Sequence, residues 1–110
     1  MNWSIEYYSD KIAQKILKMP SGLLARYIHV SDLMLKFGPN LGMPHTRAMG
    51  EKLFEMRLKS KDGICRIFYC AKIGKKIIIL HFFIKKTQKT PVKEIETARK
   101  RLVEVLSHET

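Results

Sequence analysis

The chain has 110 residues, of which 45% are hydrophobic, and these numbers predict a single domain with a buried core. It carries 21 Lys and Arg against 10 Asp and Glu, a net charge of +11, which indicates a polyanionic partner: nucleic acid, an acidic protein or an anionic membrane. No apolar run is long enough to span a bilayer, the N-terminus lacks the pattern of a signal peptide, and Cys65 and Cys70 lack a CxxC spacing. We therefore expect a cytoplasmic protein with reduced cysteines, no metal site, no cofactor and no membrane association.

The first part of the chain predicts a strand followed by two helices. Residues 3–7 have the composition of a short strand, and Ser9 or Asp10 is expected to cap the helix that follows. A second helix is expected to begin at Ser21, as its cap, and to end at Gly38, because apolar residues recur about once per turn between them. Only a few residues separate the two predicted helices, and so short a connection indicates an antiparallel helical hairpin.

The second part of the chain predicts three strands in an antiparallel meander. Residues 40–50 are rich in loop formers, whereas apolar and charged residues alternate over residues 52–59 as in a half-buried strand. Residues 64–71 give a second strand after an Asp-Gly turn, and residues 76–84 give a third. The third strand is apolar on both faces, which is typical of a position inside the sheet.

A last helix completes the predicted fold. Thr90 is expected to cap it and Pro91 to occupy its first position, with an apolar stripe that runs from Ile95 to Leu106. The order β-α-α-β-β-β-α is that of an α+β fold, with an N-terminal strand and helical hairpin, a three-stranded meander and a C-terminal helix. We expect one domain over residues 1–110.

Basic side chains gather on one face of the predicted hairpin. A turn at residues 62–63 places Lys59 opposite Arg66, and a turn at residues 61–62 places Arg57 opposite Arg66. In both cases these three cations share one face, while apolar residues occupy the other. Because like charges on paired strands repel, the set indicates an anionic ligand.

The connector after the third strand adds Lys85, Lys86 and Lys89. If the third strand pairs with the second, these lysines lie beside Arg57 and Arg66 and enclose one basic patch. Guanidinium groups bind phosphate oxygens in pairs and lysines add point charge, so the patch suits a phosphodiester backbone.

Each of these residues also has a simpler interpretation. Exposed sheet faces often carry Lys and Arg, and Glu55 could neutralise one of the cations. His81 lies in an apolar strand and is expected to pack there rather than to shuttle a proton. His45 and Arg47 lie in the predicted loop, where they can contact a ligand.

Residues 44–102 resemble the RelE/HigB toxins, in the phage-derived HigB-like branch. Glu55-Met56-Arg57 matches the E-[LM]-R strand of that branch, and residues 63–69 match its G-x-x-R-x-x-Y strand. Residues 85–91 match its KKTQKTP loop, which precedes a helix that begins with EIE, as here.

The resemblance implies the fold inferred above and a function. Members of the RelE/HigB family are toxins of type II toxin–antitoxin pairs, and many cut mRNA in the ribosomal A site. It therefore implies the ribosome, mRNA and a HigA-like antitoxin with a helix-turn-helix domain as partners. Operator DNA is then contacted only through the antitoxin.

The predicted chemistry is metal-free cleavage, in which the ribose 2′-OH attacks the adjacent phosphorus. We expect Arg57 and Arg66 to neutralise the phosphate. A lysine among cations has a lowered pKa and can transfer protons, so we expect Lys86 in that role, with Lys85 or Lys89 as the alternatives.

Four further residues are expected to contact RNA around this patch, namely His45, Arg47, Lys52 and Lys59. Some relatives place a histidine or a late tyrosine at the scissile site, but this chain has no tyrosine after Tyr69. Three other functions remain open: ParE-like inhibition of DNA gyrase, a non-enzymatic RNA- or ribosome-binding module, and a basic surface that binds an acidic partner.

Overall fold

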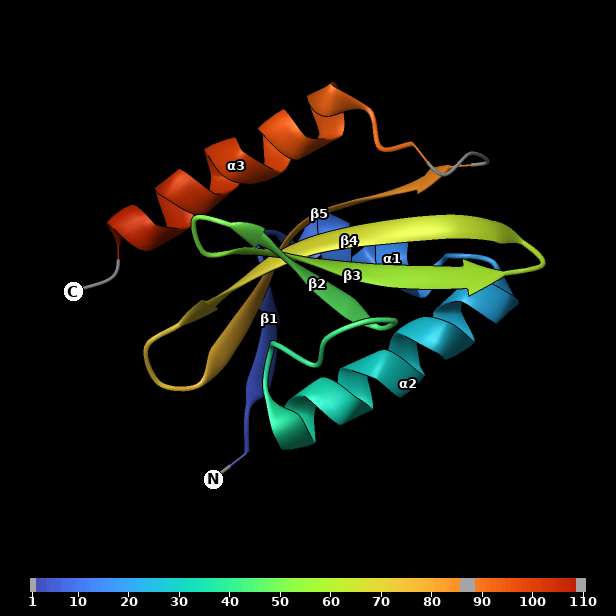
Figure 1. Ribbon diagram of the computed structural model, residues 1–110, viewed down its shortest axis with the longest axis horizontal. Coiled ribbons are helices and arrows are strands. Elements are labelled where there is room, and N and C mark those ends of the chain that lie inside the picture. Colours follow the sequence, from blue (N-terminus) through green and yellow to red (C-terminus); the bar gives the residue numbers. More distant parts are fainter. Residues whose placement is uncertain (1, 86–88, 109–110) are drawn as a thin grey trace.

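The computed structural model describes residues 2–85 and 89–108. It has a five-stranded sheet with the strand order β1-β5-β4-β3-β2, covered by helices on both faces (Figure 1). The elements in chain order are β1 (Ser4–Tyr7), α1 (Asp10–Leu17), α2 (Ser21–Phe37), β2 (Thr46–Gly50), β3 (Leu53–Ser60), β4 (Gly63–Lys72), β5 (Lys76–Lys85) and α3 (Val92–Ser107). The α+β fold class is confirmed.

Two hydrophobic clusters, one on each face of the sheet, hold the layers together. Helices α1 and α2 pack on one face, where Ile16, Leu23 and Met34 meet Met56 and Ile67. Helix α3 packs on the other face through a smaller cluster, composed of Leu53, Phe68, Cys70, Ile78, Leu80, Ala98 and Leu102. Strands β3, β4 and β5 each contribute buried residues to both clusters, and β4 is the middle strand of the sheet.

The sheet has one more strand than the sequence predicts. Residues 46–50, expected as loop, form β2 and pair antiparallel with β3. The segment TRAMG lacks the alternating apolar pattern of a half-buried strand, and only pairing with β3 makes it one. At the opposite edge, β1 pairs parallel with β5, so the sheet is mixed and β5 is an interior strand, as its two apolar faces predict.

The ends of the first two helices are stabilised differently. Ser9 caps α1 as predicted, since its Oγ accepts a hydrogen bond from the Ile12 N–H at 3.3 Å. Ser21 does not cap α2, because the helix already includes it. Instead Asp62, in the β3–β4 turn, accepts a hydrogen bond from the Gly22 N–H at 3.1 Å.

The predicted cap of α3 is also wrong. Pro91 occupies the capping position, one residue later than expected, without a side-chain hydrogen bond. The Thr90 hydroxyl instead accepts a hydrogen bond from Lys85 Nζ at 3.0 Å, and so links the end of β5 to the start of α3. None of the helices in the described part of the chain is long and apolar enough to cross a membrane.

Candidate nucleic-acid interface

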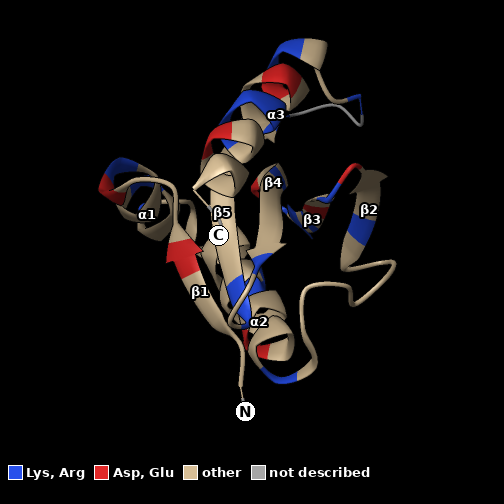
Figure 2. Cartoon of the chain, turned by 90° about the vertical axis from the view of Figure 1, so that its left-hand side faces the viewer, with Lys and Arg blue, Asp and Glu red and all other residues tan. Residues whose placement is uncertain are grey.

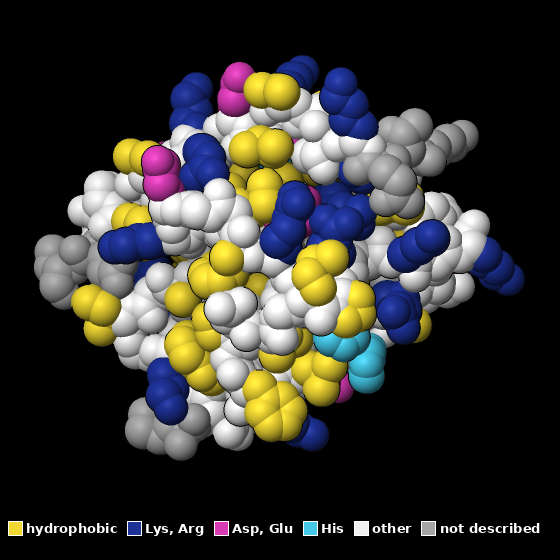
Figure 3. All heavy atoms as spheres, viewed as in Figure 1, with side chains coloured by type: hydrophobic (Ala, Val, Ile, Leu, Met, Phe, Trp, Pro, Cys, Tyr) yellow, Lys and Arg dark blue, Asp and Glu magenta, His cyan; other side chains and the backbone are white. Residues whose placement is uncertain are grey.

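Basic residues occupy neighbouring positions on the sheet face that carries α3. The β3–β4 turn is residues 61–62, so Arg57 pairs directly with Arg66, which in turn pairs with Phe83 of β5. In the next row, Lys85 pairs with Ile64. Directly paired residues share a face of the sheet, and so do residues two apart on one strand, such as Ile64 and Arg66. Arg57, Arg66 and Lys85 therefore lie on the same face, in adjacent rows. Figure 2 shows Lys and Arg on β2 and β3, and Figure 3 shows such side chains gathered right of centre over these strands.

Glu55 lies at the centre of the arginines and is fully buried. Its Oε1 accepts a hydrogen bond from Arg57 at 2.8 Å and lies 3.3 Å from a guanidinium nitrogen of Arg47. Its Oε2 lies 3.8 Å from Nε of Arg66, whose side chain is 4% exposed. A buried carboxylate is tolerated only when cations compensate it, so Glu55 and these guanidinium groups fix one another's positions.

Lys85 extends this cluster and is itself buried. Its ammonium group donates to Thr90 and lies 5.9 Å from the centroid of the Phe83 ring. Burial, and then the positive charge of Arg66, lower the pKa of Lys85 below its ordinary value. Burial and then the charge of Arg57 lower the pKa of Arg66 in the same way.

The cluster has a surplus of positive charge and a hollow beside it. Arg47, Arg57, Arg66 and Lys85 surround the single carboxylate of Glu55, so these five side chains have a net charge of +3. A hollow of about 320 Å³ adjoins them, and its lining residues are Arg26, Met43, Pro44, Arg57, Lys59 and Arg66. All the ionisable groups that line it are basic, so the hollow attracts an anion.

A comparison with protein families shows where this arrangement belongs. Residues 14–103, most of the chain, match the family described as "Phage derived protein Gp49-like (DUF891)". The chain belongs to the Gp49-like family. Members of this family are commonly toxins of toxin–antitoxin systems and are related to RelE-like toxins. A comparison with curated proteins gave no match.

In this Gp49-like protein, the residues predicted for the phosphate site are brought together as far as the structure describes them. Arg57, Arg66 and Lys59 line the hollow, and Lys85 lies on the same face of the sheet, where it pairs with the Ile64 that also pairs with Lys59. Lys86 lies outside the described residues, and Lys89 is exposed.

The predicted RNA contacts are more scattered. Arg47 joins the cluster through Glu55. The His45 ring instead faces His29 of α2, with their centroids 6.0 Å apart. Lys52 lies in the β2–β3 turn, five residues from Arg57 and hence about 16 Å along the strand. Lys52 is therefore not part of the cluster, whereas His45 borders it through its backbone carbonyl, which accepts a hydrogen bond from the Arg57 N–H at 2.9 Å.

Sequence reasoning missed Arg26 altogether. This residue belongs to α2, which covers the opposite face of the sheet. It lines the hollow together with Lys59 because β2 pairs only as far as Met56 and leaves the end of β3 as an open edge. No pattern in the sequence reports this contact, since it depends on how the helix crosses that edge.

His81 does not adjoin the hollow. Its Nε2 lies 2.6 Å from a carboxylate oxygen of Glu94, and its Nδ1 lies 3.4 Å from a guanidinium nitrogen of Arg101. A proton on Nε2 lets the ring donate to Glu94, while Nδ1 accepts from Arg101. The described residues contain no group of three or more His, Cys, Asp or Glu that could hold a metal ion.

Proposed function

We propose that this Gp49-like protein is the toxin of a type II toxin–antitoxin pair in the HigB-like branch, and that it cleaves mRNA in the ribosomal A site. The observation that carries this proposal is the direct pairing of Arg57 with Arg66 beside a hollow whose ionisable lining residues are all basic. Paired guanidinium groups match the oxygens of one phosphate, and a structural ion pair with Glu55 would need only one of them.

The reaction is transfer of the phosphorus from one ribose oxygen to another. The 2′-OH attacks the adjacent phosphorus, the bond to the 5′ oxygen breaks, and the products are a 2′,3′-cyclic phosphate and a 5′-hydroxyl end. Arg57 and Arg66 neutralise the charge that develops on the pentacovalent phosphorus. Because Glu55 already orients them, they need little rearrangement when the substrate binds.

Proton transfer is assigned to Lys85. Its lowered pKa makes the neutral amine accessible, and an amine can take the proton of the 2′-OH or return one to the leaving oxygen. Thr90 holds the amine in place. Lys86, the residue favoured by the sequence, remains an alternative within the same connector, and exposed Lys89 is a third.

Other basic side chains are assigned to binding. Lys59 and Arg26 line the hollow and contact flanking phosphates of the mRNA or the ribosome. We expect a helix-turn-helix antitoxin to cover this surface. We also expect that only the antitoxin contacts operator DNA. The reaction takes place in the cytoplasm, where ribosomes are.

The test is controlled expression in bacteria with mapping of mRNA ends. We expect cuts in phase with codons that bear 5′-hydroxyl ends, and we expect Arg57→Ala and Arg66→Ala each to reduce cutting by about a hundred-fold or more. Lys100→Ala, on the exposed face of α3, is the control and should cut normally. Circular dichroism of the purified variants shows whether they fold.

The other outcomes point to different functions. Intact mRNA with arrested DNA replication indicates a gyrase inhibitor, and growth arrest without either effect indicates a binding module. Normal cutting by a folded Arg57→Ala variant rejects the assigned site.

A further inference from the structure

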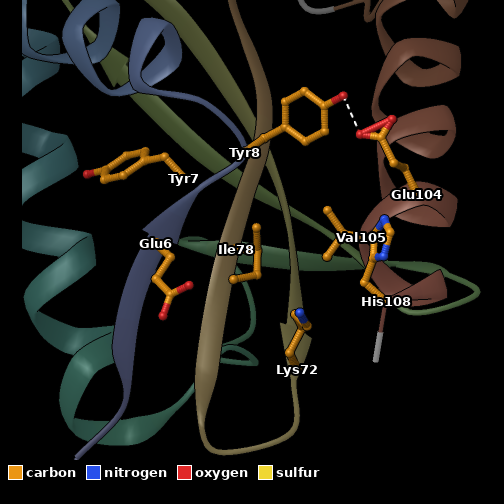
Figure 4. A pocket seen from close by; sticks show the side chains of 8 residues that line it. All are labelled: Glu6, Tyr7, Tyr8, Lys72, Ile78, Glu104, Val105 and His108. Atoms are coloured by element: carbon orange, nitrogen blue, oxygen red, sulfur yellow. Dashed lines mark hydrogen bonds between the residues drawn. The ribbon is translucent and has the colours of Figure 1, made fainter. Parts of the chain in front are cut away.

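A second basic hollow lies between α1, α3 and β5, apart from the arginine cluster. It measures about 240 Å³, and its lining includes Ser9, Lys11, Lys15, His81, Phe82 and Arg101. Its ionisable lining residues are all basic. By contrast, a hollow of the same size between β1, β5 and the end of α3 contains Glu6 and Glu104 beside Lys72, and Tyr8 donates to Glu104 there (Figure 4).

The cations of this second hollow lie close enough to repel one another. Lys11 and Lys15 are four residues apart on α1, so they lie on the same side of the helix and repel each other. Arg101 faces them from α3, where it donates to the Leu80 carbonyl at 2.8 Å and stacks over the Tyr8 ring at 4.8 Å from its centroid. These contacts hold the guanidinium group in position before any ligand arrives.

The rest of the lining adds groups that suit a nucleotide. Phe82 is half-buried and offers an aromatic surface, on which bases of a single strand stack without sequence preference. Ser9 accepts a hydrogen bond from the Ile12 N–H, and its own hydroxyl proton can donate to a phosphate oxygen. An acidic peptide would use the cations but has no need of the aromatic ring.

We propose that this hollow binds a phosphate of single-stranded RNA, as a contact separate from the arginine cluster. Phe82 precedes Lys85 by three residues on β5, about 10 Å along the strand, and this odd spacing places the two side chains on opposite faces of the sheet. Strand β1 pairs with β5 only as far as Ile79, so an RNA strand that leaves the cluster can pass around this edge of β5 to reach the hollow. The choice of RNA as the ligand rests on the proposed function, whereas the anion site rests on the lining alone.

The test measures binding rather than cleavage. The probe is a short, fluorescently labelled single strand with 2′-O-methyl riboses, which has no free 2′-OH and cannot be cut. We compare Lys11→Gln/Lys15→Gln with the control Lys18→Gln/Lys36→Gln, which removes the same charge from exposed lysines that do not line the hollow. Both fluorescence anisotropy and its salt dependence are recorded.

We expect the first double variant to weaken binding about ten-fold or more and to reduce the salt slope by about 0.7 for each phosphate that the protein no longer neutralises. The control should change both quantities much less. Amide NMR signals of the unmodified protein near Ser9 and Arg101 should shift when the probe is added, a measurement that does not depend on variants folding.

Each other result overturns the proposal. Equal weakening by both double variants shows a general effect of charge, and unshifted signals near Ser9 show that the hollow stays empty. Loss of antitoxin affinity without loss of probe affinity assigns the hollow to an acidic protein. Under the proposed function Arg57→Ala reduces cleavage by about a hundred-fold or more, whereas it leaves this hollow unchanged, so failure of one proposal is distinguishable from failure of the other.

Discussion

Glu55 organises the candidate site although it is not expected to touch the substrate. It is completely buried, and its two carboxylate oxygens lie near Arg47, Arg57 and Arg66. Without it, two directly paired arginines would repel each other across the β3–β4 ladder. The single negative charge reduces that repulsion and still leaves the cluster strongly positive, which is what an anion site requires.

Replacement of Glu55 by Gln should destabilise the protein by about 3–5 kcal/mol, the usual cost of removing one partner from a buried ion pair. Arg66 is nearly inaccessible to solvent and would keep its charge without the carboxylate. The free energy of unfolding, measured in urea, checks this result. Glu96→Gln, on the exposed face of α3, is the control and should change that free energy by less than about 0.5 kcal/mol. Equal effects of the two changes would contradict the assigned role of Glu55.

Lys85 should give the cleavage rate a characteristic pH dependence. A basic amine acts only when neutral, so the rate should rise with pH and level off at the pKa of Lys85, below the value of an ordinary lysine. Lys85→Arg keeps the positive charge at every pH and should cut about 10²–10⁴-fold more slowly, without the rise. Single-turnover rates on ribosome-bound mRNA at several pH values test this. If the pH dependence of the cleavage rate is unchanged in Lys85→Arg, another group of the connector transfers the proton.

The same pKa shift has a defined effect on stability. Because folding lowers the pKa of Lys85, the unfolded chain binds more protons than the folded one between the two pKa values. The contribution of Lys85 to stability is therefore unfavourable at neutral pH and becomes less so as the pH rises through that window.

At the scale of elements, local patterns predict most of the fold. Alternation in β3, the turn residues before β4 and the apolar stripes of the helices each depend on neighbouring residues, and the structure contains all of these elements. The sequence could not show β2, whose residues become a strand only by pairing with β3. Nor could it show the N-terminal cap of α2, because Asp62 lies forty residues from the Gly22 N–H that donates to it.

That distant cap gives a prediction for α2. Asp62→Ala leaves the Gly22 N–H without its acceptor and removes a negative charge from the helix N-terminus, so it should lower stability by about 1 kcal/mol. Lys61→Ala, in the same turn, is exposed and should have little effect. Thermal unfolding of the two variants measures the difference. Similar melting temperatures would show that the cap contributes nothing to α2.

At the scale of the whole molecule, each of two hollows brings together basic side chains from elements that are distant in the sequence. The pairing of Arg57 with Arg66 could be predicted because the two residues belong to one hairpin. The burial of Glu55, the contribution of Arg26 and the convergence of α1 with α3 could not be, since each depends on packing between distant elements. Both hollows include residues of the sheet, and α3 contributes Arg101 to the second one.

The position of α3 should depend on a few core residues, because its cluster is the smaller of the two. Leu102 is 5% exposed within that cluster, and Leu102→Ala should cost about 2–5 kcal/mol. The neighbouring Val103 is 70% exposed, so Val103→Ala should change stability by less than about 0.5 kcal/mol. Urea unfolding followed by circular dichroism measures both values. If the two changes cost the same, α3 is not anchored by this cluster, and the lining of the second hollow by Arg101 loses its structural basis.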